Sequence, residues 1–174
     1  MTDYQTTTNG ADPLLGVLPN GSLEPKTTEV FGQAELAIKR SRRGLTGTIE
    51  NPMLREVVFM RPQHIPLAVE QGQYDFGICG LDCIAESRSK VEVLAKLPYS
   101  RATSGSVKIV LVAANDSPIV TVGDVTDGMV VVSEYPNLTH DYFAGIGRKV
   151  EVRFSYGSTE ALVPQFAPYG SMPH

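Results

Sequence analysis

The chain has 174 residues, of which 42% are hydrophobic and 20% charged, the balance of an ordinary globular protein. This length suits one compact domain or two small lobes, and it can bury a core without disulfides or a structural metal. The net charge of −4, from 15 basic and 19 acidic residues, argues against a surface built for nucleic acid or for an anionic membrane. The longest apolar run, residues 109–114, is about a third of a membrane span, and the polar start of the chain is unlike a signal peptide, so we expect a soluble cytoplasmic protein.

The first half of the chain predicts strands that alternate with helices. Residues 1–12 are polar and Thr-rich, and we expect a flexible tail that gives way to ordered structure at Leu14. A turn at Pro19-Asn20-Gly21 follows the apolar residues 14–18, and Ser22 is expected to cap a helix that has Pro25 in its first turn. The further elements expected here are a loop or irregular strand at 39–47, strands at 57–60, 74–79 and 91–97, and helices at 62–72 and from 81 to about 86.

The second half continues the alternation after a polar stretch, residues 100–106, which is the candidate hinge between two lobes. We expect the first lobe to span residues 13–103 and the second 104–174. The elements expected in the second lobe are strands at 107–114, 129–132 and 150–154, a helical turn at 122–125, and helices at 138–144 and from 157 to about 165. Short apolar strands that alternate with helices predict an α/β fold with mostly parallel sheets.

Ligands of open α/β sheets bind beyond the carboxyl ends of the strands, so the strand-to-helix junctions are the candidate site. At the first junction, Gly21 allows a close approach of the backbone to a ligand, and the N–H groups of the following helix favour an anion. A simple capped turn explains the same residues. At the second junction, Arg61 could grip a phosphate or carboxylate with two hydrogen bonds, or form a salt bridge with Glu70 or Asp75.

Three further junctions carry polar or aromatic side chains. Asp82, after Gly80, could accept hydrogen bonds from a ribose or a base, or only cap its helix. Tyr135 could stack on a base, an interaction worth about 1–3 kcal/mol, or lie half-exposed in a turn, with Asn137 capping the next helix. Residues 157–160 combine a capping pattern with a further possible anion site.

Cysteine and histidine chemistry is weakly supported by the spacing. Cys79 and Cys83 lie four residues apart with no further pair nearby, so we expect reduced thiols rather than a zinc site. His64, His140 and His174 match no catalytic triad and no metal spacing. Composition and periodicity alone therefore indicate a two-lobed α/β protein for which an anionic or nucleotide ligand is possible.

The junction residues also form five motifs whose order and spacing are informative. These are Leu18-Pro19-Asn20-Gly21-Ser22-Leu23, Phe59-Met60-Arg61-Pro62-Gln63-His64-Ile65-Pro66, the stretch 69–82 with its pattern Gly-x-x-Asp-x-Gly-Ile, Glu134-Tyr135-Pro136-Asn137-Leu138-Thr139, and Gly157-Ser158-Thr159-Glu160-Ala161. Together they resemble the catalytic region of the ATP phosphoribosyltransferases, the first enzymes of histidine biosynthesis. The resemblance covers about residues 14–166.

This resemblance implies a fold of two lobes, as in periplasmic solute-binding proteins, with the active site in the cleft. It implies a reaction that joins N1 of ATP to the ribose of phosphoribosyl pyrophosphate, with Mg²⁺ and release of pyrophosphate. Such a reaction needs positioning and a neutralised leaving group more than a strong nucleophile. It also implies a homo-oligomer, with neither nucleic acid nor a membrane as partner. The substrate-binding residues that it implies are Gly21 and Ser22 at a phosphate-facing turn, Gly80 and Leu81 beside the base or ribose, Arg61, Asp82 and Tyr135 in the nucleotide pocket, and Glu134 and Asn137 beside them.

The chain departs from the family pattern in several places. Asn20 stands where the family usually has Lys, Cys79 where it has Thr, and Arg43-Gly44-Leu45 lacks the usual aromatic residue. After residue 166 the family continues with a strand and a Thr-Gly phosphate loop, whereas this sequence carries Pro168 and Pro173, which do not suit a strand interior. We therefore expect a truncated or frame-shifted second lobe. Three hypotheses follow: a transferase, a nucleotide-binding module without turnover, or an inactive fragment of the same fold.

Overall fold

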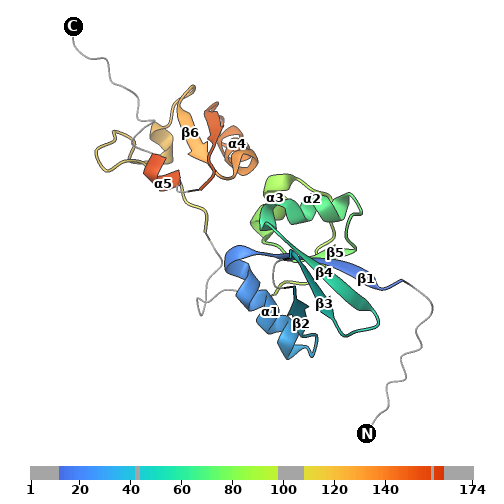
Figure 1. Cartoon of the computed structure of the whole chain (residues 1–174). Helices are drawn as coiled ribbons and strands as arrows, with labels where there is room; N and C mark the ends of the chain where they lie inside the picture. Colours follow the sequence, from blue (N-terminus) through green and yellow to red (C-terminus); the bar gives the residue numbers. More distant parts are fainter. Residues whose placement is uncertain (1–11, 42–43, 98–107, 158, 163–174) are drawn as a thin grey trace. The chain divides into compact units, whose positions relative to one another are not determined.

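The computed structural model describes residues 12–41, 44–97, 108–157 and 159–162 (Figure 1). The chain divides into two compact units, Met1–Arg101 and Ala102–His174, which we call the first and the second unit. Of the tail expected at residues 1–12, residues 1–11 lie outside the described residues, and so does the hinge expected at 100–106. No helix in the described part of the chain is long and apolar enough to cross a membrane.

A five-stranded sheet in the order β2-β3-β4-β1-β5 organises the first unit. The strands are β1 (Leu14–Pro19), β2 (Ile38–Arg40), β3 (Thr46–Ile49), β4 (Leu54–Met60) and β5 (Phe76–Gly77). β1 runs parallel to both of its neighbours, with Pro19 opposite Met60 and Val17 opposite Gly77, while β3 is antiparallel to β2 and β4. The carboxyl ends of β4, β1 and β5 therefore lie at one edge of the sheet.

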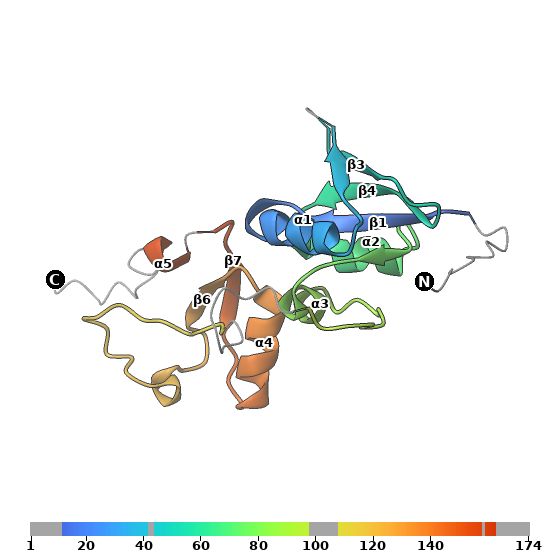
Figure 2. The same cartoon turned by 90° about the horizontal axis from the view of Figure 1, so that it is seen from below.

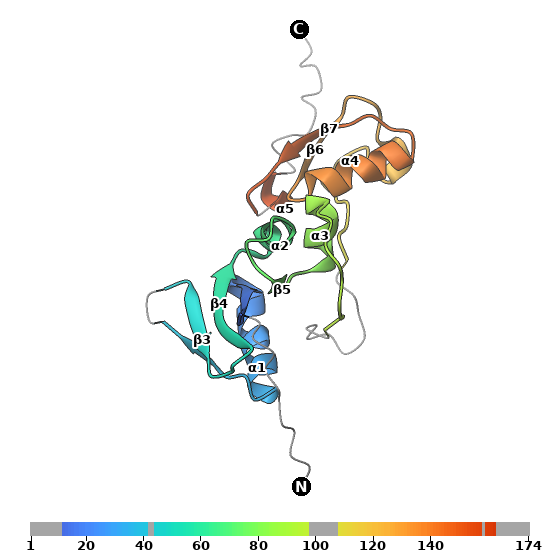
Figure 3. The same ribbon diagram turned by 90° about the vertical axis from the view of Figure 1, so that its right-hand side faces the viewer.

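Helices cover both faces of this sheet. They are the short 3₁₀ helices η1 (Gly21–Leu23) and η2 (Pro62–His64), and the α-helices α1 (Glu24–Gln33), α2 (Ile65–Glu70) and α3 (Leu81–Ser87). The chain crosses from β1 to β4 in one direction and from β4 to β5 in the other, so right-handed crossovers place α1 and α2 on opposite faces. Figures 1 and 3 show α1 on one side of the sheet and α2 with α3 on the other.

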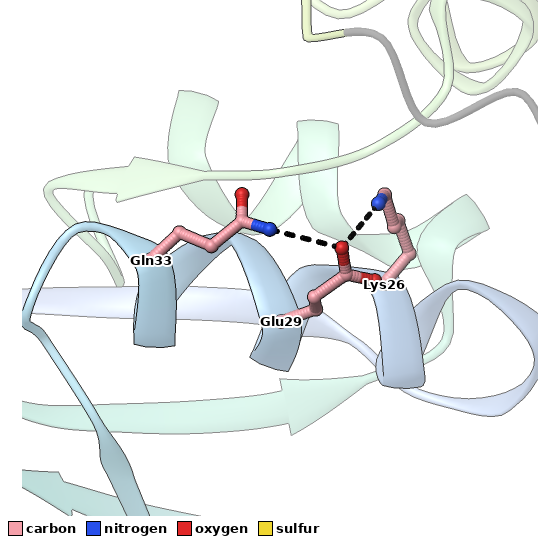
Figure 4. A network of polar contacts seen from close by, with 3 residues as sticks. All are labelled: Lys26, Glu29 and Gln33. Atoms are coloured by element: carbon pink, nitrogen blue, oxygen red, sulfur yellow. Dashed lines mark hydrogen bonds and ion pairs between the residues drawn. The ribbon is translucent and has the colours of Figure 1, made fainter.

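The core of the first unit lies between α1 and the sheet. Its buried side chains are Leu18, Phe31, Ile49, Leu54, Val57 and Phe59. Phe31 fixes α1 to the strands, and the guanidinium of Arg40 lies 4.3 Å from the centre of the Phe59 ring. On the outer face of α1, one Glu29 carboxylate oxygen accepts from Lys26 at 2.6 Å and from Gln33 at 3.1 Å (Figure 4). These pairs are three and four residues apart, a spacing that supports a helix from its exposed side.

The first unit confirms the helices at 62–72 and 81–86 and the strand at 57–60, and it corrects three details. The N-cap of α1 is Leu23, without a side-chain cap bond, because Gly21 at φ +72° turns the chain into η1 before α1 starts; the prediction that Ser22 caps the helix is wrong. The strand expected at 74–79 contains only Phe76 and Gly77. Before it, the carboxylate of Asp75 accepts from the amide of Leu15 at 2.7 Å, a bond that replaces part of the ladder.

The strand expected at residues 91–97 is also wrong. These residues form no ladder, and the side chains of Leu94 and Leu97 are 84% and 45% exposed. Alternating apolar side chains favour a strand only where a neighbouring strand can take the backbone hydrogen bonds. No such neighbour lies beside residues 91–97 among the described residues.

The second unit contains a two-stranded parallel sheet and one long helix. Its elements are η3 (Val122–Asp124), β6 (Val130–Ser133), α4 (Pro136–Gly145), β7 (Glu151–Phe154) and α5 (Thr159–Leu162). Figure 2 shows α4 alongside β6 and β7, and Phe143 of this helix is 1% exposed. All five elements confirm the predicted elements to within two residues at their starts. The strand expected at 107–114 is wrong, since described residues 108–114 form no ladder.

Gly77 offers a test of how tightly the first unit is packed. A methyl group at Gly77 would lie 2.5 Å from the side chain of Ile65, whereas one at Gly32 in α1 meets nothing within 4 Å. We expect Gly77→Ala to lower the free energy of unfolding by about 1–3 kcal/mol through overpacking. Gly32→Ala should leave it unchanged or raise it by up to about 1 kcal/mol. Chemical denaturation measures the free energy of unfolding of both variants, and equal effects would contradict the tight packing of Gly77 against Ile65.

Candidate functional site

Three loops leave the first sheet at the same edge. The amide of Asn20 donates to the carbonyl of Met60 at 2.9 Å, and that of Ile78 to the carbonyl of Val17 at 3.1 Å. These bonds continue the parallel ladders just past the ends of the strands. The structure thereby brings together the junctions predicted from the sequence: the turn at Gly21 and Ser22, Arg61, and the start of α3 at residues 80–82.

Arg61 is an exposed cation at this edge. It has extended backbone angles, φ −61° and ψ 132°, and it is the N-cap of η2. Its two expected acidic partners have other bonds, because Glu70 accepts from the amide of Lys90 at 3.1 Å and Asp75 from that of Leu15 at 2.7 Å. Within the described ranges neither acid forms an ion pair with Arg61. The guanidinium is therefore exposed to solvent at the carboxyl edge of a parallel sheet, which suits a bidentate grip on phosphate.

The turn that faces Arg61 across the β1–β4 pair depends on Gly21. Its φ of +72° is strained for other residues, and the position a Cβ would take is open space. Gly21 and Ser22 are both exposed. Glu24 in the first turn of α1 pairs with Arg40, so its charge is compensated locally. A ligand can therefore approach the backbone of this turn without meeting a side chain at Gly21.

At the third loop the carboxylate of Asp82 folds back over Gly80. A Cβ at Gly80 would lie 2.0 Å from Oδ1 of Asp82, so a side chain at this position would displace the carboxylate. Asp82 lies in the first turn of α3, where the helix dipole favours a negative charge, but Gly80 is the N-cap and has no side-chain cap bond. Leu81 extends into solvent and is 54% exposed. This loop thus exposes the apolar side chain of Leu81 and holds the carboxylate of Asp82 beside the backbone of Gly80.

The two cysteines are free thiols in this structure, Cys79 half-buried and Cys83 buried. Burial first, and then the charges of Cys83 and Asp82, raise the pKa of Cys79 to about 11. Burial, followed by the charge of Asp82, raises the pKa of Cys83 to about 11. Across the described ranges no group of three or more His, Cys, Asp or Glu side chains is placed to hold a metal ion.

This pKa shift predicts a loss of stability in alkali. In the unfolded chain the thiols titrate near 9.0, whereas in the folded chain they keep their protons to about 11. Their contribution to the free energy of unfolding is fully present below pH 9 and is lost as the pH rises through about 11. Urea denaturation across this pH range should show a steeper decline for the natural sequence than for the double variant Cys79→Ser, Cys83→Ser. Parallel declines would contradict the shift.

In the second unit the two parallel strands also end side by side. Ser133 lies opposite Phe154, and the amide of Ser155 donates to the carbonyl of Ser133 at 3.0 Å. The hydroxyl of Ser133 accepts from the amide of Tyr135 at 2.9 Å and from the hydroxyl of Thr139 at 2.8 Å. These bonds hold the backbone of Glu134 and Tyr135 in place.

A second set of hydroxyls orients Glu134. The hydroxyls of Ser155 and Thr159 lie 2.6 Å apart, and that of Thr159 donates to a carboxylate oxygen of Glu134 at 3.4 Å. Ser155 is only 3% exposed, so it depends on Thr159 for a partner. Together Ser133, Thr139, Ser155 and Thr159 form what we call the hydroxyl cluster. The sequence predicted Thr159 as part of a possible anion site at residues 157–160, but it did not single out Ser133, Thr139 or Ser155, although a Ser at the end of β6 and another just past β7 are a readable signal.

The cap of α4 differs from the prediction. Tyr135 is the N-cap, and Pro136 occupies the first helical position, to which its fixed φ is suited. The prediction that Asn137 caps this helix is therefore wrong, since Asn137 lies inside the first turn. Tyr135 and Asn137 are half-buried. At the fifth junction Gly157 has φ +108° and leads into α5, while Ser158 lies outside the described residues.

The hydroxyl cluster can be tested by removing one member. Thr159→Val should leave the buried hydroxyl of Ser155 without its partner and lower the free energy of unfolding by about 1–3 kcal/mol. Thr126→Val, at an exposed position of the same unit, should change it by less than about 0.5 kcal/mol. Thermal melts followed by circular dichroism compare the two variants. If they melt alike, the cluster does not stabilise this edge.

Comparison with known proteins agrees with this architecture. The family model for ATP phosphoribosyltransferase matches residues 61–167. In solved structures, a chain of the ATP phosphoribosyl transferase (HisG:HisZ) complex from Thermotoga maritima superposes with a TM-score of 0.63 over 87% of this chain and 68% of that chain. The identity is 18%, so this likeness concerns the fold, and it confirms the predicted α/β class of the periplasmic-binding-protein type with mostly parallel sheets.

Curated relatives are more similar in sequence. The ATP phosphoribosyltransferases of Desulforudis audaxviator and Pelotomaculum thermopropionicum are 39% and 37% identical over 147 residues, 84% of this chain and 50% of each relative. That of Koribacter versatilis is 36% identical over 150 residues, 86% of this chain and 51% of the relative. The chain thus spans about half the length of the curated relatives it matches.

Proposed function

The chain belongs to the ATP phosphoribosyltransferase family, and on this basis we propose that it joins N1 of ATP to the ribose of phosphoribosyl pyrophosphate, the first step of histidine biosynthesis. In this reaction the bond between the ribose C1 and the pyrophosphate oxygen breaks, and its electron pair leaves with pyrophosphate. A bond from N1 of the adenine to C1 forms. Both substrates carry several negatively charged phosphates, so binding them requires local positive charge.

The observation that carries the proposal is the exposed guanidinium of Arg61 beside the Gly21 turn. Arg61 and the turn leave neighbouring parallel strands at their carboxyl ends, where α/β sheets bind ligands. A guanidinium offers two parallel N–H bonds to a phosphate, and the bare backbone at Gly21 leaves room for it. We assign Arg61, Gly21 and Ser22 to the phosphates, and Gly80, Leu81 and Asp82 to the adjoining ribose or base.

In the second unit we assign Tyr135 to stacking on a base, with Glu134 and Asn137 beside it. Tyr135 follows the end of β6, and the hydroxyl cluster bonds its backbone amide and the carboxylate of Glu134 next to it. Base stacking on an aromatic side chain is worth about 1–3 kcal/mol. Pre-ordered hydrogen bonds around it reduce the entropy that binding must otherwise remove.

The chemistry asks for position and charge stabilisation rather than for a strong nucleophile. As the bond to pyrophosphate breaks, the ribose takes on oxocarbenium character and the leaving oxygens gain charge. Arg61 is placed to stabilise that charge, and the two thiols stay protonated at neutral pH and play no part. Holding N1 of ATP near C1 of the ribose contributes the rest of the rate enhancement, because it makes the reaction effectively unimolecular.

In this scheme Mg²⁺ binds together with the substrate phosphates. The described residues contain no cage of three or more side-chain ligands, but Mg²⁺ is held through substrate phosphates with one or two carboxylates. Asp82 in the first unit, or Glu134 in the second, is the carboxylate that would hold it. When bound, it neutralises the charge of the pyrophosphate. We place the reaction in the cytoplasm, in line with the two free cysteines.

Arg61→Gln tests the assignment. It should lower kcat/KM for phosphoribosyl pyrophosphate roughly 10- to 100-fold, because a charge-assisted hydrogen bond is worth about 1.5–3 kcal/mol. Arg61→Lys should recover only part of this loss, because an ammonium cannot bind in the bidentate manner. Lys96→Gln, at an exposed position of the same unit, is the matched control and should have no effect. The readout is the formation of phosphoribosyl-ATP in a coupled assay.

The same preparation separates the other hypotheses. Calorimetry with ATP that shows binding without product indicates a nucleotide-binding module. A cooperatively melting chain that neither binds ATP nor forms product would contradict the proposal. Full activity of Arg61→Gln would keep the reaction and overturn the role of this arginine.

A further inference from the structure

An Asn-Gly pair forms the turn that follows β1, and its polar groups have no partner among the described residues. The carboxamide of Asn20 makes no cap bond to η1 and no other hydrogen bond to the described chain, and Asn20 is half-buried. The backbone amide of Gly21 likewise donates to no described residue, and Gly21 is exposed. An unbonded amide nitrogen therefore lies next to an unbonded carboxamide, at a position that water can reach.

The backbone geometry of this pair favours a reaction between the two groups. Asn20 has an extended ψ of −179°, so the nitrogen of Gly21 lies gauche to the Cβ that carries the carboxamide. A limited rotation about ψ therefore brings this nitrogen toward Cγ. Gly21 has no side chain to obstruct the approach, and the space where its Cβ would lie is open.

The other described asparagines lack this combination. Asn51 precedes Pro52, whose nitrogen carries no hydrogen, and Asn137 lies in the first turn of α4 before the bulky Leu138. A second Asn-Gly pair, Asn9-Gly10, lies outside the described residues.

We propose that Asn20 is a site of spontaneous deamidation that places a carboxylate in the phosphate-facing turn. The nitrogen of Gly21 loses its proton and attacks Cγ of Asn20, which closes a five-membered imide ring. The bond from Cγ to the side-chain nitrogen breaks, and that nitrogen leaves as ammonia with the proton. Water then opens the ring at either carbonyl and leaves aspartate or isoaspartate. The net reaction exchanges ammonia for water and needs no oxidant or other co-reactant.

The position of the new charge gives the modification a consequence. The register that places Pro19 opposite Met60 places residue 20 opposite Arg61, and the bond from the amide of Asn20 to the carbonyl of Met60 continues that register. Neighbouring strands lie about 4.8 Å apart, so a carboxylate at position 20 can pair with the guanidinium of Arg61. It would then compete with the phosphate that we assign to Arg61. This consequence rests on the proposed function, whereas the chemical step does not.

Incubation of the whole chain in water labelled with oxygen-18, followed by mass spectrometry of its peptides, tests the chemical step. A protease that cuts before Asp separates Asn20 from Asn9 at Asp12, and it cuts before position 20 only where ordinary aspartate has formed. We expect label at position 20 to accumulate at least roughly tenfold faster than at Asn137, because the helix must first open there. The control Asn20→Gln should take up no label, because glutamine would need a larger ring.

A synthetic peptide of residues 17–24 gives the rate of the same pair without the fold. If this peptide has reacted fully while position 20 of the folded chain carries no label, the proposal is overturned.

Kinetics before and after incubation test the consequence. The KM of the natural chain for phosphoribosyl pyrophosphate should rise with the label, and Asn20→Asp should raise it roughly two- to fivefold, as an exposed ion pair with Arg61 competes with the phosphate. Incubation should not change the KM of Asn20→Gln. Gln73→Glu adds the same charge at an exposed position before β5, at the opposite edge of the sheet, and should leave KM unchanged.

Circular dichroism checks that each variant keeps the fold of the natural chain. Label at position 20 with a constant KM would overturn the effect on phosphate binding. If no preparation forms product, calorimetry with phosphoribosyl pyrophosphate measures the affinity instead. The failure of the proposed function and the failure of this proposal are thereby distinguished.

Discussion

The parallel pairing of β1 with β4 and β5 is the constraint on which the first unit depends. Because β1 lies between two parallel neighbours, with Pro19 opposite Met60, three loops that are distant in sequence must leave the sheet at one edge. The buried side chains of Val17, Leu18 and Phe59 stabilise this pairing from within. A shift of one residue in β1 would exchange the faces to which Val17 and Leu18 point, so the core and the site geometry share one register.

The second unit uses the same principle with fewer strands. Its single parallel pair brings Ser133 next to Phe154, and this contact allows the hydroxyls from both loops to orient Glu134. Among the described residues this sheet has two strands, and the side chains of residues 109–112 are exposed.

The two edges differ in the chemistry they offer. The first unit presents a guanidinium, a glycine turn and bare backbone, which suit phosphates. The second presents an aromatic ring and an oriented carboxylate, which suit a nucleoside. The polyphosphate binding that we propose relies on local donors rather than on a broad basic surface, which is consistent with the net charge of −4.

The sequence by itself determined the alternation of elements, the class of fold and the position of each junction. Glycine, proline and apolar runs act locally, so the helices at 62–72, 81–86 and 138–144 and the strands at 57–60, 129–132 and 150–154 could be predicted from them. The five motifs could likewise be matched to a family, because each of them is a continuous stretch of the chain.

Only the tertiary structure decided which residues meet. Apolar alternation at 91–97 and 107–114 predicted strands that do not form among the described residues, because a strand exists only where a neighbour accepts its backbone hydrogen bonds. Ser22 and Asn137 fit the composition of helix caps, but the φ of Gly21 and the position of Pro136 set the helix starts elsewhere. The hydroxyl cluster joins residues up to 26 positions apart, from Ser133 to Thr159, and that proximity arises from the pairing of β6 with β7, which no local pattern encodes.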